Sequence, residues 1–253
     1  MKLMYWNCTS PGLGGNSFAR AKKEFIGEVV RRLDPDYLCL DEMSGGVSDA
    51  SSSDRYATNV LNGPGVSYSS GAVSVNPGVH LNTATFIKDG VTQKHFQVGL
   101  PSQQWGTDRT KRDLTKCPFR IGMKDYAVWF LHANASASGG LAAARLADTN
   151  ADGTTSIFIG DFNCPIGNAQ GAVAPDLGGH AFSQWTRGEF GTAEVPRRRP
   201  PLKYTPNSVI DYAICDGAKV RIQALDSVGL FGDDGLLSFI RDFDHFPVLY
   251  EVT

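Results

Sequence analysis

The sequence lacks the excess of positive charge that would draw a protein onto nucleic acid or an anionic membrane through its overall field. Its 24 Lys and Arg residues are balanced by 26 Asp and Glu residues, which gives a formal net charge of −2. Any binding to a polyanion must therefore depend on local clusters of basic residues.

Long apolar runs are also missing. No stretch approaches the ~20 apolar residues of a membrane-spanning helix, and Met1 to Trp6 lack the basic and long apolar segments of a secretory signal peptide. We therefore expect a soluble protein, either cytoplasmic or a secreted or delivered effector whose leader was replaced by Met1.

Closely spaced cysteine pairs, which mark zinc sites and disulfide frameworks, do not occur. The five cysteines are scattered along the chain: Cys8, Cys39, Cys117, Cys164 and Cys215. We expect mostly buried thiols, and one disulfide is left open.

The chain has enough apolar residues for a substantial core. Its 253 residues are 42% hydrophobic, the size of one large or two small domains. No internal repeat or linker divides it, so we predict a single domain over residues 1–253.

Periodicity and turn signals predict few helices and many strands. Helices are expected from about Asn16 to Asp34-Pro35 and over 140–148, and surface loops at 44–53 and 106–116. Lys124-Asp125 is expected to be a hairpin turn, and 164–207 to be irregular. The expected strands are 2–7, 37–40, two or three antiparallel runs within 72–99, 119–123, 126–131, 156–159, 209–215, 219–225 and 247–252. This mixed order predicts an α/β (α+β) fold of stacked sheets flanked by helices.

Polar residues of catalytic type stand at the ends of apolar strands, where a rigid sheet presents reactive groups. They are Asn7, Glu42, His132, Asp161 with Asn163, and Asp244 with His245. Each alone is also compatible with an ordinary turn.

The order of these residues, however, resembles the full motif set of the endonuclease/exonuclease/phosphatase superfamily. The matching segments are Trp6-Asn7, Leu40-Asp41-Glu42, His132-Ala133-Asn134, Gly160-Asp161-Phe162-Asn163, Ile210-Asp211-Tyr212 and Asp244-His245-Phe246-Pro247-Val248. The resemblance covers nearly the whole chain. It implies a four-layered sandwich of two packed mixed β-sheets with outer helices.

Within that superfamily the chain is similar to deoxyribonuclease I and to the catalytic subunit of cytolethal distending toxins. The segment from Phe119-Arg120 to His132-Ala133 and Ser138-Gly139-Gly140 carries the toxin likeness. DNA is then the expected substrate, and delivery or partner subunits are expected if the protein is a toxin.

The resemblance also implies the roles of the site residues. Glu42, assisted by Asn7 and Asp244, suits Mg²⁺, with Mn²⁺ as a substitute, because hard cations prefer oxygen ligands. Asp211 would orient His245 as the general base, and His132 would protonate the leaving oxygen or bind the phosphate. Asp161 and Asn163 would orient the nucleophile, the metal and the phosphate.

Substrate binding is assigned to Asn134 and to a set of basic side chains: Lys116, Arg120, Arg197, Arg198 and Arg199. The sequence departs from the deoxyribonuclease pattern twice. Lys116 stands where an arginine is usual, and it lacks the bidentate fork that suits phosphate. The carboxylate that pairs with the first histidine has no counterpart around residues 80–84.

Two other functions stay open: a phosphatase of the same fold acting on phosphoinositides or another phosphate ester, and a non-catalytic binding module. Residues 148–153 also begin like a calcium-binding loop, but the position that needs a bidentate glutamate is Ile159. A helix-to-strand turn is the preferred interpretation of that segment.

Overall fold

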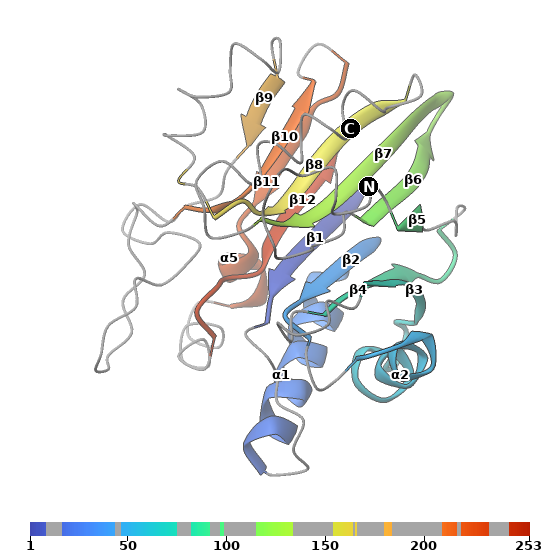
Figure 1. The fold of residues 1–253 in the computed structure, drawn as a ribbon, viewed down its shortest axis with the longest axis vertical. Helices are drawn as coiled ribbons and strands as arrows, with labels where there is room; N and C mark the ends of the chain where they lie inside the picture. The colour runs from blue at the N-terminus through green and yellow to red at the C-terminus, as the bar shows by residue number, and fades with distance from the viewer. Residues whose placement is uncertain are drawn as a thin grey trace, which may run out of the picture.

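Two six-stranded β-sheets pack face to face in the computed structural model (Figure 1). The structure describes residues 1–8, 17–43, 47–74, 82–91, 97–98, 115–133, 154–163, 165, 180–183, 209–216, 219–232 and 243–253. The two packed sheets, each with parallel and antiparallel neighbours, confirm the predicted sandwich of two mixed sheets. The single domain over 1–253 stays a prediction.

The first sheet has the strand order β11-β12-β1-β2-β4-β3. Its central pair, β1 and β2, is parallel, and its other neighbours are antiparallel. The strands are β1 (Lys2–Asn7), β2 (Tyr37–Asp41), β3 (Tyr68–Ser74), β4 (Thr83–Lys88), β11 (Ile222–Leu225) and β12 (Val248–Val252).

The second sheet has the order β5-β6-β7-β8-β10-β9. Here β7 and β8 are parallel, and the other neighbours are antiparallel. The strands are β5 (Gln97–Val98), β6 (Thr115–Ile121), β7 (Lys124–His132), β8 (Thr155–Asp161), β9 (His180–Ser183) and β10 (Asp211–Asp216).

A continuous apolar core fills the space between the sheets. Alternate residues of each strand point into it, because successive side chains of a strand lie on opposite faces. The buried members include Leu3, Tyr5, Tyr37, Cys39, Val128, Phe130, Ile157, Ile159, Ala213 and Cys215. At one end of the sandwich the inward-facing residues of these strands are polar, and they form the site described below.

Helices cover the outer face of the first sheet (Figure 1). They are α1 (Ser17–Leu33), α2 (Ala50–Tyr56) with the following π-helical turn η1 (Ala57–Leu61), and α5 (Ser227–Phe231). The buried stripe of α1, which includes Phe25, Val29 and Leu33, packs on this face as its spacing predicted. The helix ends before Asp34-Pro35, also as predicted, and Asp34 has a φ of 50°.

The prediction of a surface loop over 44–53 is wrong in its second half, because α2 begins at Ala50. Asp49 caps this helix: its carboxylate accepts a hydrogen bond from the Ser52 backbone N–H at 2.7 Å, and the Ser52 hydroxyl contacts the Asp49 N–H in return. This capping box stabilises the first turn despite the serine-rich composition.

The hairpin turn predicted at Lys124-Asp125 is also misplaced. The turn occupies Gly122 and Met123, and Lys124 and Asp125 already belong to β7. Gly122 has a φ of 60°, which glycine adopts without strain, so the glycine and not the charged pair decides where the chain reverses.

The sequence prediction also missed η1, β9 and α5, and the helix predicted over 140–148 lies outside the described residues.

Four of the five cysteines, Cys8, Cys39, Cys117 and Cys215, are buried free thiols, and Cys164 lies outside the described residues.

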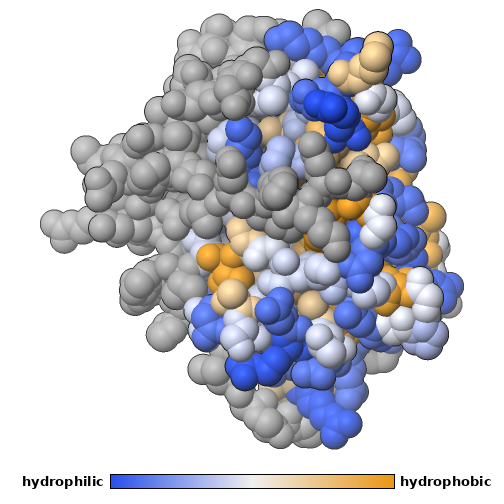
Figure 2. Space-filling view, turned by 90° about the vertical axis from the view of Figure 1, so that its right-hand side faces the viewer, coloured by the Kyte–Doolittle hydropathy of each residue, from blue (hydrophilic) through white to orange (hydrophobic). Residues whose placement is uncertain are grey.

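On the face shown in Figure 2 the described surface is mostly hydrophilic, with small separate hydrophobic areas. Among the described residues, no helix combines the length and apolar character needed to cross a membrane.

Candidate active site

The inward-facing rows of five strands end in polar residues at the same edge of the sandwich. In the first sheet, Asn7 follows Leu3 and Tyr5, and its register partner on β2 is Asp41. In the second sheet, His132 and Asp211 flank Asp161 as its register partners on β7 and β10. Strand pairing alone therefore gathers these groups on the two facing sheets.

Asp161 lies at the centre of this cluster. Its Oδ2 is 3.5 Å from His132 Nε2, 3.8 Å from His245 Nε2 and 3.5 Å from the Asn7 side-chain amide. Asp161 is only 1% exposed. Two imidazoles and an amide thus converge on one buried carboxylate, and each comes from a different segment of the chain.

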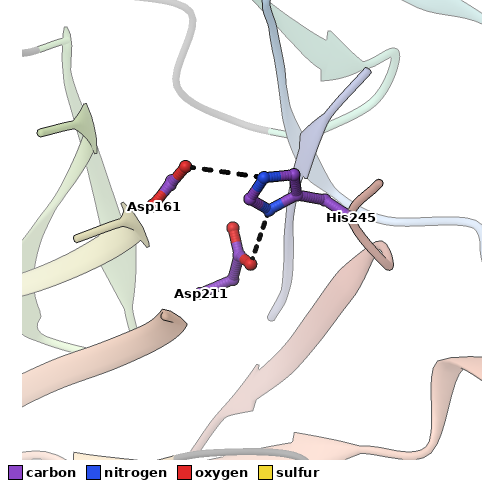
Figure 3. A group of neighbouring side chains, drawn as sticks. All are labelled: Asp161, Asp211 and His245. Carbon is purple, nitrogen blue, oxygen red and sulfur yellow. Dashed lines mark hydrogen bonds and ion pairs between the residues drawn. The ribbon is translucent and has the colours of Figure 1, made fainter. Parts of the chain in front are cut away.

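The first Asp–His pair joins the segment before β12 to β10 (Figure 3). His245 Nδ1 lies 2.8 Å from Asp211 Oδ2. Since a carboxylate only accepts, Nδ1 carries the proton, and Nε2 is directed towards Asp161. Burial lowers the pKa of His245, but Asp211, Asp161 and Asp244 outweigh it and raise this pKa to about 10.

The second Asp–His pair is formed by His132 on β7 and Asp41 on β2, so it crosses from one sheet to the other. His132 Nδ1 contacts Asp41 Oδ2, and both side chains are buried. Burial raises the pKa of Asp41, but His132 and further hydrogen bonds lower it to about 2, which keeps the group ionised. The carboxylate partner of His132 is therefore Asp41, which lies on β2 and not around residues 80–84.

Glu42 lies next to Asn7 at the end of β2. It has a φ of 52°, which ends the extended backbone of β2, and its Oε1 accepts a hydrogen bond from Asn7 Nδ2 at 3.2 Å. Burial raises the pKa of Glu42, although His132 opposes this shift. Asp244 is half-buried beside His245.

The donor set fits a hard divalent cation. Five carboxylates, Asp41, Glu42, Asp161, Asp211 and Asp244, surround two imidazoles, and this excess of negative charge is one that a divalent cation would neutralise. Glu42, Asn7 and Asp244 could hold such an ion through oxygen atoms. The ligand atoms of Asp161, Asp211 and His245 also lie within 4.8 Å of one another and offer a further position.

The turn Gly160-Asp161-Phe162-Asn163 is fixed on both sides. Phe162 is buried and stacks on Tyr212 with ring centroids 4.1 Å apart, and its N–H donates to the Ile210 carbonyl at 2.8 Å. Asn163, with a φ of 49°, donates from its backbone N–H to Asp161 Oδ1 at 2.8 Å and from Nδ2 to the Ala133 carbonyl at 2.6 Å. These contacts hold Asp161 between the two histidines.

Solved structures that superimpose on this chain include endonuclease/exonuclease/phosphatase proteins. One such family protein from Leptotrichia buccalis superimposes with a TM-score of 0.67 at 13% identity, covering 100% of this chain and 99% of that one. TDP2 from D. rerio, complexed with a single-strand DNA product, gives 0.65 at 13% identity, with 100% and 98% covered. A mannosyl-6-phosphatase from Bacteroides thetaiotaomicron gives 0.61 at 14% identity, with 100% and 99% covered.

This chain has the endonuclease/exonuclease/phosphatase fold. No family model matches the sequence, and no curated protein matches it.

Within this endonuclease/exonuclease/phosphatase fold, the two described basic residues assigned to substrate binding lie apart from the histidines. Lys116 and Arg120 alternate with the buried inward residues Cys117 and Phe119, so they face the outside of the second sheet, whereas His132 faces inward. Lys116 lies 5.3 Å from the Trp129 ring, and Arg120 pairs with Asp125 at 2.6 Å near the hairpin turn.

The remaining predicted substrate residues, Asn134 and the triplet Arg197, Arg198 and Arg199, lie outside the described residues, as does the segment 148–153.

The sequence prediction missed three residues that the structure brings to the site: Asp41, Tyr5 and Thr83. The signal for Asp41 was its position opposite Asn7 at the end of a buried strand.

Proposed function

We propose that this protein is a metal-dependent phosphoric ester hydrolase and that it cuts DNA as an endonuclease. The observation that carries the proposal is the convergence of two buried Asp–His pairs on Asp161, next to the Asn7–Glu42 contact. Hydrolysis of a phosphate ester requires an activated water, neutralised phosphate oxygens and a protonated leaving oxygen, and this set contains groups for each.

The metal side of the proposal rests on Glu42, Asn7 and Asp244. A bound Mg²⁺ ion, with Mn²⁺ as a substitute, would supply positive charge to the phosphate oxygens. Asn163 offers an amide donor where a further carboxylate would repel the phosphate.

The two histidines divide the proton transfers. His245, oriented by Asp211, would take a proton from the attacking water once a bound cation offsets the carboxylates that raise its pKa, and His132, oriented by Asp41, would give one to the leaving oxygen. Both Nε2 atoms lie within 4 Å of the same Asp161 oxygen, so the two imidazoles face one position beside this carboxylate where a phosphate would bind. The attack would be in line and without a covalent enzyme intermediate.

The likeness to TDP2 complexed with single-strand DNA product supports a nucleic-acid substrate. Because Lys116 and Arg120 face away from the histidines, the DNA proposal does not depend on them. The arginine triplet Arg197, Arg198 and Arg199 stays a predicted contact with the phosphate backbone. The toxin likeness and its delivery subunits also stay predictions.

A phosphatase of the same fold is the second candidate, because a mannosyl-6-phosphatase superimposes over the full length of this chain. The two activities share one catalytic set. A non-catalytic binding module is disfavoured, since it would have no need to preserve both Asp–His pairs and the Asn7–Glu42 contact.

Nicking of supercoiled plasmid, run beside phosphate release from phosphoinositides and a sugar phosphate, tests the proposal. We expect nicking with Mg²⁺, none with EDTA, and a loss of roughly 10³-fold in His245→Ala. Met123→Ala, at the 98% exposed hairpin tip, is the control that should nick normally. Phosphate release with intact plasmid would move the assignment to a phosphatase, and no turnover of any substrate would contradict both.

A further inference from the structure

The carboxylate of Asp41 is held by side chains from three other strands. Tyr5 on β1 donates its hydroxyl to Oδ2 at 2.9 Å, and Thr83 on β4 donates its hydroxyl to Oδ1 at 2.6 Å. His132 approaches Oδ2 from the other sheet. Asp41 is 1% exposed, so no bulk water competes for these positions.

We propose that Tyr5 and Thr83 are positioning residues that act on His132 through Asp41. This inference rests on the proposed function of His132 as the donor of a proton to the leaving oxygen. Neither hydroxyl contacts His132 in the described interactions; each fixes one oxygen of the carboxylate that orients the imidazole.

The geometry explains why one donor per oxygen matters. A carboxylate held only by the imidazole could rotate about its side-chain bonds, and the imidazole would follow it. With Thr83 on Oδ1 and Tyr5 on Oδ2, the plane of the carboxylate is set by β4 and β1, the two neighbours of β2. Hydrogen bonds to a charged acceptor are among the stronger ones in proteins, so each fixes the group effectively.

The same carboxylate also touches the metal-binding side. The backbone N–H of Glu42 hydrogen-bonds to Asp41, at the position where the chain takes its positive φ. Tyr5 and Thr83 therefore hold a carboxylate that orients both His132 and the Glu42 backbone.

Matched variants separate this role from a general effect of losing a buried hydroxyl. The test variants are Tyr5→Phe and Thr83→Val, with Thr83→Ser as the conservative replacement that restores the hydroxyl. The controls are Tyr56→Phe and Thr115→Val, because the hydroxyls of Tyr56 and Thr115 are buried with no hydrogen-bond partner in the described part of the chain. Each control removes the same atom without touching Asp41.

The deciding readout is the dependence on the leaving group. With a DNA oligonucleotide, whose leaving oxygen needs a proton, kcat should fall about tenfold or more in Tyr5→Phe and Thr83→Val, with little change in KM. With a p-nitrophenyl phosphodiester, whose leaving group needs no proton, the loss should be under about threefold. Thr83→Ser should recover most of the activity, and the controls should match the wild type.

Equal losses on both substrates, or the same losses in Tyr56→Phe and Thr115→Val, would overturn the positioning role. Nitrogen NMR of the His132 ring keeps the inference separate from the proposed activity. If the wild type turns over neither substrate, the proposed function fails, yet Tyr5→Phe should still disturb the Nδ1-protonated tautomer of His132 while Tyr56→Phe does not. An unchanged His132 spectrum in Tyr5→Phe would refute the inference whatever the activity.

Discussion

At the residue scale, the chemistry of the site depends on which histidine nitrogen carries the proton. Asp211 is 0% exposed and lies 2.8 Å from His245 Nδ1, so it keeps a proton on Nδ1 and leaves Nε2, which faces Asp161, as the nitrogen that can exchange a proton. The selection needs an acceptor at this position, because a neutral imidazole has one donor and one acceptor nitrogen.

Asp211→Asn tests this selection. An asparagine can present its amide N–H to Nδ1 and stabilise the opposite tautomer, which leaves no lone pair on Nε2. We expect kcat for phosphodiester hydrolysis to fall by about 10³-fold to 10⁴-fold with an intact fold, as for the loss of an orienting aspartate in other Asp–His pairs. Asp125→Asn, which makes the same change at an exposed ion pair, should leave kcat unaltered. A loss below about tenfold in Asp211→Asn would mean that the tautomer is set elsewhere.

At the scale of elements, the pairing of β7 with β8 sets the distance between His132 and Asp161. Gly160 is what permits the close approach: a Cβ atom at this position would lie 1.8 Å from the Leu131 carbonyl oxygen. Because that neighbour is backbone, a side chain can be accommodated only if the two strands move apart.

Gly160→Ala should therefore displace the site as well as destabilise the protein. We expect a loss of unfolding free energy on the order of 3 kcal/mol, and a fall in kcat that persists at temperatures where the variant is fully folded. Gly65→Ala is the comparison, since it has a φ of 76° but no atom within 4 Å of the added methyl group. It should lose about 1 kcal/mol and keep its kcat. A stable, fully active Gly160→Ala variant would show that β7 and β8 tolerate the wider spacing.

The bounds of some helices and strands follow closely from the sequence, whereas others do not. Strands that are buried along almost their whole length, such as Thr155–Asp161 and Val248–Val252, were predicted within one or two residues because their continuous apolar runs mark them clearly. Helix α2 was missed because its serines carry no helical apolar pattern, and its start depends on the Asp49–Ser52 capping box. The hairpin turn was misplaced because the polar Lys124-Asp125 pair masked the turn-forming Gly122.

At the scale of the whole molecule, the motifs predicted which residues would meet but not how the sheets pair them. Asp211 with His245 followed from the resemblance. Asp41 with His132 did not, because the contact depends on the facing of β2 and β7 across the core, which no local pattern specifies. The outward direction of Lys116 and Arg120 was missed for a related reason: their alternation with Cys117 and Phe119 was not used to assign a face.

The buried acids of the core predict how the whole fold responds to alkali. Burial raises the pKa of Tyr56, Tyr250, Cys39 and Cys117 well above their ordinary values. A group whose pKa is raised by folding contributes stability that is present below its unfolded pKa and is lost as pH rises above it. The unfolded values are 9.0 for cysteine and 10.0 for tyrosine.

We therefore expect a melting temperature that begins to fall above about pH 6.5, where the raised pKa of His245 starts to cost stability, and that falls more steeply above about pH 9, where the buried cysteines and tyrosines add to the loss. Tyrosinate absorbance from the core residues should appear only together with the loss of near-ultraviolet circular dichroism. Ionisation of all eight tyrosines near pH 10 in a protein with an intact dichroism spectrum would contradict the burial that the structure assigns.

The position of β12 between β11 and β1 has a consequence for the order of folding. The pairing of β1 with β12 joins residues that are almost the full chain apart, such as Lys2 and Glu251, and we expect contacts of such separation to form late because they close the longest loop. His245 precedes β12 and is fixed by the Trp6 indole, which donates to its carbonyl at 3.0 Å. We therefore expect the Asp211–His245 pair to be completed only when β12 joins the first sheet, so an incompletely folded molecule would lack this proposed catalytic pair.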